Sequence, residues 1–288
     1  MEFYLTALIQ GLCYCTLALG IYISMKIFNI PDITTDGSYT LGGAVTAVML
    51  MHHQPVYVVL PVVVLAGAAA GALTGLIHTK LKINALLAGI LVMTALYSVN
   101  LTIMGRSNLP LIGLSSLFTL ANISNNPDLN TFWIAFIFIL IATLKIDYLL
   151  KTDFGLAMRA TGNSESMIRA LGVNTDRMKI VGLALANALT ALSGYLITQY
   201  QGFADISMGI GVVIMGLGSV IIAETLINWL RITSVWGSLA LVLGGAILFQ
   251  FVLAFTLSSG VDAIYLKAVT AIFVLLIVGL PRLTRRAA

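Results

Sequence analysis

The sequence predicts an all-α integral membrane protein, a polytopic bundle of about eight or nine transmembrane helices. Of its 288 residues, 59% are hydrophobic and only 9% are charged, whereas roughly 25% of residues are charged in soluble domains. The mean hydropathy is +1.03. Several apolar runs reach the roughly 20 residues that a helix needs to cross about 30 Å of hydrocarbon, and barrel strands are much shorter. We therefore expect one transmembrane domain over residues 1–288.

Nine apolar runs follow one another along the chain. They lie at 5–28, 38–51, 56–77, 84–104, 131–150, 180–200, 206–224, 236–257 and 262–280. The second and seventh runs are short and rich in glycine, which is typical of helices that are broken or re-enter the membrane without crossing it. The nine runs thus predict a bundle in which not every helix spans the bilayer.

The distribution of basic residues predicts the orientation. With the N-terminus outside, 13 of the 15 Lys and Arg residues fall on the cytoplasmic side, and Arg106 and Lys267 fall on the other. The positive-inside rule favours this register over its inverse. It places the polar loop 151–179 and the C-terminus in the cytoplasm. The basic pI of about 9.1 therefore reports orientation in a membrane, and nucleic acid is not an expected partner.

Two glycine-rich segments resemble each other at an offset of 169 residues. Segment 36–42 reads DGSYTLG and segment 205–211 reads DISMGIG. In the predicted register the spans around them run in opposite directions, so the two halves would form an inverted repeat. Such repeats place a substrate path at their interface, near broken helices in the middle of the membrane.

The start of each glycine-rich segment offers polar side chains inside an apolar chain. A side-chain oxygen there either caps a helix by accepting from free backbone N–H groups, or contacts a solute in a translocation path, and both roles can coexist. The candidate residues of a substrate path are Asp36, Ser38, Tyr39, Thr40, Asp205 and Ser207.

Sequence signatures of membrane-embedded enzymes are absent. The chain has no His-Glu-x-x-His motif, no paired aspartates within spans and no phosphate-binding G-x-x-x-x-G-K-[ST] loop. We expect no catalytic residue, metal or cofactor, and any ATP chemistry must come from another chain. An ion-coupled secondary transporter is the alternative function. No predicted span has an acid at its centre, which argues against such a carrier, although backbone carbonyls of broken helices also bind sodium.

Three glycines in the third run, Gly67, Gly71 and Gly75, are four residues apart. Small residues at this spacing form a groove on one face of a helix and permit close contact with a second helix. The groove predicts either packing within the bundle or self-association of two copies. A non-transport membrane scaffold would rest on this packing alone.

The 29-residue loop 151–179 is the largest polar segment and is expected to dock a cytoplasmic partner. Gly162 and Gly172 bracket a short predicted helix, and Glu165 and Arg169 form an i, i+4 pair on one of its faces.

Two passages resemble a known family. The loop matches the "R-A … N … A-x-x-x-G-[IV]-N" pattern of the coupling loop in ATP-binding-cassette (ABC) importer permeases of the branched-chain amino-acid and ribose permease superfamily. The matching residues are Arg159, Ala160, Asn163, Gly172, Val173 and Asn174. Segment 28–42 is similar to "F-P-D-L-T-x-D-G-S-x-x-L-G" of the tryptophan/tyrosine transport permease subgroup, although no residue selects an aromatic solute.

The resemblance implies the permease subunit of an importer for a small polar solute, an amino acid or a relative. It implies two copies of the permease, a cytoplasmic ABC ATPase and an extracytoplasmic substrate-binding protein, in the lipid of a bacterial inner membrane. The residues that it implies for ATPase coupling are Arg159, Gly162, Asn163, Glu165, Arg169 and Gly172.

Overall fold

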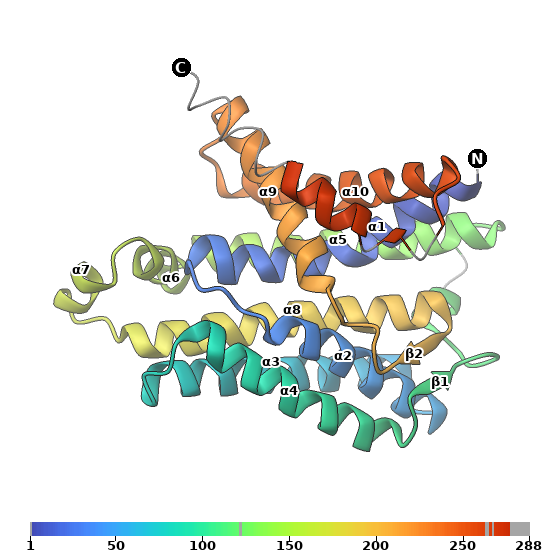
Figure 1. Cartoon of the computed structure of the whole chain (residues 1–288), viewed down its shortest axis with the longest axis horizontal. Coiled ribbons are helices and arrows are strands. Elements are labelled where there is room, and N and C mark those ends of the chain that lie inside the picture. Colours follow the sequence, from blue (N-terminus) through green and yellow to red (C-terminus); the bar gives the residue numbers. More distant parts are fainter. Residues whose placement is uncertain (1, 121–122, 263–264, 267, 277–288) are drawn as a thin grey trace.

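The computed structural model describes residues 2–276 except 121–122, 263–264 and 267. The long helices lie side by side, with α6 and α7 at one end of the bundle and the strands β1 and β2 at the other (Figure 1). The elements in chain order are α1 (Glu2–Ile21), the π-helix η1 (Tyr22–Ile27), α2 (Thr34–Met51), α3 (Val56–Lys80), α4 (Ala85–Met104), β1 (Asn108–Pro110), the short 3-10 helix η2 (Leu117–Thr119), α5 (Pro127–Lys151), α6 (Asp153–Asn163), α7 (Glu165–Ala170), α8 (Thr175–Gln201), β2 (Phe203–Asp205), α9 (Val212–Leu230) and α10 (Val235–Ser258).

The predicted polytopic helical fold is confirmed. Within the described residues, seven helices are long and apolar enough to cross a membrane: α1 together with η1, α3, α4, α5, α8, α9 and α10. They coincide with seven of the nine predicted runs. The seventh run begins at Val212 rather than at residue 206, because β2 and a series of turns occupy 203–211. The ninth run, 262–280, lies partly outside the described residues.

The second predicted run forms α2, which is not among those seven helices. Of its 18 residues 13 are buried, and Thr, Ser and Gly residues are among them along its length. It packs against α3, α4 and α8. A helix that contacts other helices instead of lipid does not need the hydropathy of a lipid-facing span, and small polar residues favour close helix contact.

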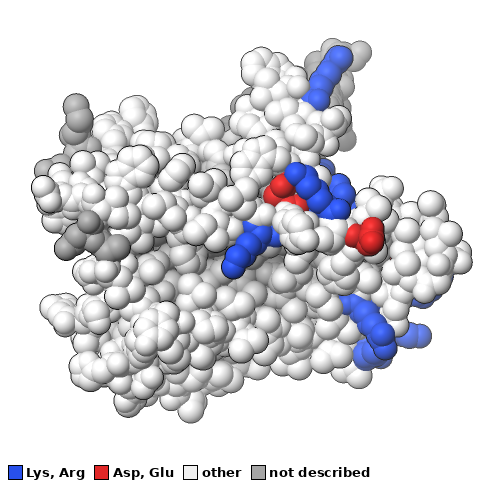
Figure 2. Space-filling view, turned by 180° about the vertical axis from the view of Figure 1, so that it is seen from behind, with Lys and Arg blue, Asp and Glu red and all other residues white. Residues whose placement is uncertain are grey.

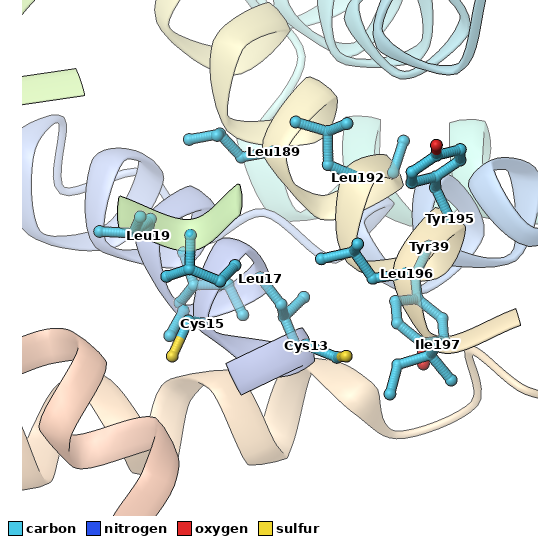
Figure 3. Packing of buried hydrophobic residues seen from close by; sticks show 14 of the residues in the cluster. Cys13, Cys15, Leu17, Leu19, Tyr39, Leu189, Leu192, Tyr195, Leu196 and Ile197 are labelled. Atoms are coloured by element: carbon cyan, nitrogen blue, oxygen red, sulfur yellow. The ribbon is translucent and has the colours of Figure 1, made fainter. Parts of the chain in front are cut away.

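The centre of the bundle is α8, which packs against α1, α2 and α3. In the most apolar 18-residue stretch of α8, 78% of the residues are buried, whereas in that of α4 only 28% are. The α8 helix is therefore central and α4 is peripheral. Figure 3 shows leucines of α8 above the segment of α1 that carries Cys13 and Cys15, and the Cys15 sulfur points away from them, 3.7 Å from the Leu243 carbonyl of α10. Both cysteines are free and fully buried, as expected for cysteines that pack as small apolar residues.

The glycine groove of α3 faces α8. A Cβ atom at Gly67, Gly71 or Gly75 would lie against backbone atoms of α8, and at Gly71 it would overlap the carbonyl oxygen of Leu183. The predicted packing role is confirmed. Because α8 of the same chain fills the groove, this face of α3 is not available for association with a second copy.

The first span is interrupted before it reaches α2. The α-helix α1 widens into the π-helix η1, and the N–H of Ile30 then bonds to the carbonyl of Ser24 at 2.9 Å. Asn29 has a φ of 54°, a left-handed conformation that asparagine adopts more readily than most residues. The chain therefore reverses here, and α2 begins inside the bundle rather than at its surface.

Substituting Gly71 with valine tests the contact between α3 and α8. Overpacking at a tight helix contact costs about 1–3 kcal/mol, so Gly71→Val should lower the thermal unfolding temperature of the detergent-solubilised protein. Gly244→Ala is the matched control, because nothing lies within 4 Å of a Cβ at that position of α10. An unfolding temperature in Gly71→Val equal to that of the control would contradict the close contact.

Candidate functional site

The amino end of α9 lies inside the bundle beside the first turn of α2 (Figure 1). Gly211 precedes it with a φ of 85°, a left-handed conformation that glycine adopts without steric cost. Asp36 of α2 accepts hydrogen bonds from the backbone N–H groups of Gly211 at 2.9 Å and of Val213 at 2.8 Å. The carboxylate satisfies two free donors and opposes the positive end of the helix dipole. Asp36 therefore caps α9 and not its own helix.

Asp36 and Asp205, which the 169-residue offset aligns, lie in different environments. Asp36 lies in the first turn of α2, whereas Asp205 ends β2 and faces Asn108 of β1. What the two halves share is the order of elements: a long helix, an extended link and a shorter helix that begins inside the bundle. That order runs from α1 to α2 in one half and from α8 to α9 in the other.

Four of the six candidate path residues form two separate pairs. Thr40 donates a hydrogen bond to the carbonyl of Asp36 at 3.1 Å, one turn away on α2. Asp205 accepts from both the N–H and the hydroxyl of Ser207, and from Asn108 at 3.2 Å. These hydrogen bonds, with that of the Ser207 hydroxyl the largest contribution, hold the pKa of Asp205 below its usual range. Asp205 and Ser207 thus belong to the β1–β2 end of the bundle.

The other two candidates, Ser38 and Tyr39, point to different neighbours. Ser38 donates to the side-chain carbonyl of Asn187 on α8 at 2.7 Å. Tyr39 stacks on Tyr14 of α1 with the ring centroids 6.1 Å apart, and both tyrosine hydroxyls are 3.4 Å from each other. These contacts are internal to the bundle and join α2 to α8 and to α1.

A buried carboxylate that sequence reasoning missed lies where the first span is interrupted. Asp32 is 1% exposed, and its side chain accepts from the Asn187 amide at 2.7 Å and from the Thr34 N–H at 2.9 Å. Asn187 lies midway along α8, so Asp32 lies deep in the bundle although it belongs to a link and not to any predicted span. The signal that would have found it is the polar Asn187 in the centre of an apolar run, because such a residue requires a partner.

The loop between α5 and α8 folds into two short helices, and the first of them, α6, contacts the interrupted span. Gly162 of α6 lies so close to Ile27 that a Cβ would overlap the Ile27 carbonyl oxygen. Asn29 donates to the carbonyl of Gly162 at 3.1 Å. Arg159, on the same helix, has a buried Nε atom without a hydrogen-bond partner among the described residues. The α6 helix is therefore held directly against the end of η1.

The α7 helix is tied to α8 by charged side chains. Glu165 accepts from Arg169 at 2.8 Å and from Lys179 at 2.6 Å, and Thr175 donates to it at 3.2 Å. Lys179 above all holds the pKa of the Glu165 carboxyl below its usual range. Asp176 extends the cluster to Arg169 at 3.5 Å. Glu165 and Arg169, predicted to contact a partner, are thus engaged within the chain.

Two large apolar side chains are exposed at α7 and its C-cap, beside exposed Ser166 and Arg169. Met167 is 62% exposed and Leu171 is 69% exposed, whereas Ile168 between them is buried. Asn163 is also exposed, and Gly172 ends the helix with a φ of 85°, as its predicted role as a stop signal requires. The α7 helix is shorter than predicted and begins at Glu165. Gly162, which was predicted to mark its start, lies within α6.

An apolar bundle with interrupted helices at its centre and a structured polar loop at one end defines a multi-pass membrane transport protein. The chain belongs to the branched-chain amino acid transport system permease family, whose model matches residues 3–279. It is therefore a permease component of an ABC transport system, which is a transport component and not an enzyme. Membership in this family implies an ATPase and a substrate-binding protein as partners, and it decides against the ion-coupled alternative.

Individual relatives agree with this assignment. The chain is 39% identical to the tyrosine transport system permease protein of Clostridioides difficile over 94% of its own length and 88% of the relative. It is 28% identical to the ribose import permease protein RbsC of Haemophilus influenzae, over 73% of the chain and 64% of RbsC. The fold is similar to that of a metal-chelate type ABC transporter in an inward-facing conformation, with a TM-score of 0.52 and 16% identity over 96% of this chain and 83% of the other.

Replacing Asn187 with leucine should destabilise the bundle. It removes the donor to Asp32 and the acceptor for Ser38, and a lost hydrogen bond to a charged group costs about 2 kcal/mol. We expect a lower thermal unfolding temperature in detergent, and partial recovery in the double variant Asp32→Asn/Asn187→Leu, where no charge is left unpaired. Thr225→Val is the control, because that exposed hydroxyl bonds only within α9. Equal unfolding temperatures for Asn187→Leu and the control would refute the role of this network.

The attachment of α7 to α8 should weaken in acid. Because the pKa of Glu165 is lowered in the folded protein, its stabilisation is fully present above the ordinary glutamate pKa and is lost as the pH falls through the lowered value. Amide hydrogen exchange in 165–179, corrected for intrinsic rates, should rise about two- to fivefold, the range of a partly exposed ion pair. Glu165→Gln should exchange faster at neutral pH and lose the pH dependence. A pH dependence that persists in Glu165→Gln would assign it to another group.

Proposed function

We propose that the chain is the membrane subunit of an ATP-driven importer for an amino acid or a related small polar solute. The observation that carries the proposal is the contact of α6 with η1. Through this contact, a polar loop at the end of the bundle is joined to the interruption of the first span. The solute class comes from the similarity to the tyrosine transport permease over nearly the whole chain. An extracytoplasmic binding protein would deliver the solute to the end that carries β1 and β2.

The charge distribution supports a cytoplasmic position for α6 and α7. Figure 2 shows the Lys and Arg residues of one face gathered toward the half that carries these helices, with the other half nearly without charge. Basic residues are enriched on the cytoplasmic side of membrane proteins. We place the protein in the bacterial inner membrane, with α6 and α7 on the cytoplasmic side. The C-terminus, with Arg282, Arg285 and Arg286, is expected in the cytoplasm but lies outside the described residues.

We assign the ATPase contact to the apolar face of α7. Met167 and Leu171 are exposed beside an open depression lined by Ser164, Glu165, Ser166, Arg169 and Ala170. Exposed apolar side chains rimmed by polar ones are typical of a protein interface. Glu165 and Arg169 then act as supports, because their ion pairs fix α7 on α8 and transmit its movement. Through Gly162 and Asn29, the same loop would pull on the interrupted first span.

A second permease copy completes the proposed assembly as a homodimer. Each copy has one α6–α7 loop, so two loops would receive two ATPase subunits. ATP binding would bring the ATPases together, the loops would move with them, and the opening of the path would change sides. The path would pass the interrupted helices, where polar groups are available inside the bundle.

Acidic substitutions on α7 test the ATPase contact. Met167→Asp and Leu171→Asp each place a charge in the proposed apolar interface, and loss of a central apolar contact typically weakens binding by more than 1 kcal/mol. The tagged permease should then copurify less of the ATPase encoded with it and lose ATP-driven uptake. Leu81→Asp is the matched control, a 66% exposed leucine at the end of α3. Undiminished copurification in both α7 variants would remove α7 from the interface.

A further inference from the structure

A cavity of about 260 Å³ lies between α2, α4 and the turn that leads into α9. Its polar lining consists of Asp36 and Thr40 of α2 and of Thr94, Tyr97 and Asn100 of α4. The cavity thus contains two of the candidate path residues together with three residues of α4 that sequence reasoning did not select. It lies next to the two hydrogen bonds by which Asp36 caps α9.

Three side chains around this cavity each donate a hydrogen bond to a backbone carbonyl. The Thr40 hydroxyl donates to the Asp36 carbonyl at 3.1 Å, and the Thr94 hydroxyl donates to the Ile90 carbonyl at 2.8 Å. The amide nitrogen of Asn100 donates to the Gly37 carbonyl at 3.2 Å. Since the single hydrogen of each threonine hydroxyl points to a backbone carbonyl, what these two hydroxyls still offer are acceptor lone pairs.

Asn100 shows that one of these acceptors is unused. The residue is 1% exposed, and its Oδ1 atom has no hydrogen-bond partner among the described residues. Its orientation is fixed, because exchanging oxygen and nitrogen would place two oxygens against each other at the Gly37 carbonyl. A buried acceptor without a partner is costly, and its cost is removed when a donor binds.

The rest of the cavity is apolar and reaches the surface of the chain. Met93, Ile206 and Ile210 form its walls, and the Tyr97 ring at its mouth is 51% exposed. Intramembrane polar residues face the interior of a bundle or a water-filled cavity rather than lipid. The open side, with Thr94 and Tyr97, therefore faces the second permease copy of the proposed homodimer.

We propose that this cavity is a transit site for a solute with an ammonium group and an apolar or aromatic body. The ammonium donates to Asn100 Oδ1 and to the acceptor oxygen of Thr40, near the negative charge of Asp36. The body packs on Tyr97 and the apolar walls. A carboxylate on the solute gains nothing here, because Asp36 already occupies the N–H groups that open α9. This inference rests on the proposed function and deepens it, since it names the recognised group.

Protection of an introduced thiol from a membrane-permeant maleimide tests the site. The variant Thr94→Cys places the thiol in the cavity, and the native Cys13 and Cys15 are fully buried. The probes are L-tyrosine, tyramine, which lacks the carboxylate, and 3-(4-hydroxyphenyl)propionate, which lacks the amine. With the permease in its complex with the ATPase, L-tyrosine and tyramine should slow labelling, and the acid should not. Thr102→Cys is the control. Thr102 is an exposed residue about two turns further along α4, and a thiol there should show no protection.

Two further variants identify the groups that bind. Asn100→Leu removes the unused acceptor and should weaken protection by tyramine about tenfold, the effect of a hydrogen bond from a charged donor. Tyr97→Ala removes an exposed ring, so folding is not at risk, and it should weaken protection by both amines. The two variants give independent readings of the polar and the apolar part of the site.

The outcomes separate this inference from the proposed function. Absence of protection by L-tyrosine and tyramine in Thr94→Cys, or equal protection by the deaminated acid, overturns the transit site. If ATP-driven uptake of L-tyrosine by the wild-type complex persists in that case, the proposed function stands. Protection without any ATP-driven uptake would support the site and count against the importer.

Discussion

The structure depends on satisfying the backbone where two helices are interrupted inside a membrane. Hydrocarbon offers no hydrogen bonds, so every N–H and C=O group freed by an interruption must find its partner within the protein. At the first interruption Asp32 accepts from the N–H of Thr34 and is itself held by Asn187. At the second, Asp36 accepts from the first N–H groups of α9. Two aspartates four residues apart thus support both interruptions.

This arrangement also connects the polar loop to the centre of the bundle. The α6 helix touches the end of η1 at Gly162 and Ile27, and Asn29 bonds across the contact. From there the chain reaches Asp32 within three residues. The α7 helix is joined to the start of α8 by the ion pairs of Glu165. A movement of the loop would therefore reach α8 from one side and the interruption of the first span from the other, through short hydrogen bonds and ion pairs.

The cavity beside α4 has a related origin. Because α2 and α9 both begin inside the bundle, the space next to their first turns cannot be filled by a continuous helix. Asn100 of α4 bonds to the Gly37 carbonyl of α2 at this point and keeps an acceptor unused. In the proposed transit site, the polar groups that stabilise an interruption would also contact the solute, so capping and solute contact would coexist at Asp36.

By itself the sequence determined the class of protein, the position of most spans, the groove of α3 and the polar loop with its family resemblance. These properties follow from hydropathy, glycine spacing and charge, which can be read from short stretches of the sequence. Only the tertiary structure decided which helix Asp36 caps, how deep Asp32 lies and which candidate path residues share a cavity. The hydrogen bonds concerned join residues 175 and 155 positions apart. Partners at such distances are set by how the helices pack, and no local pattern in the sequence records that packing.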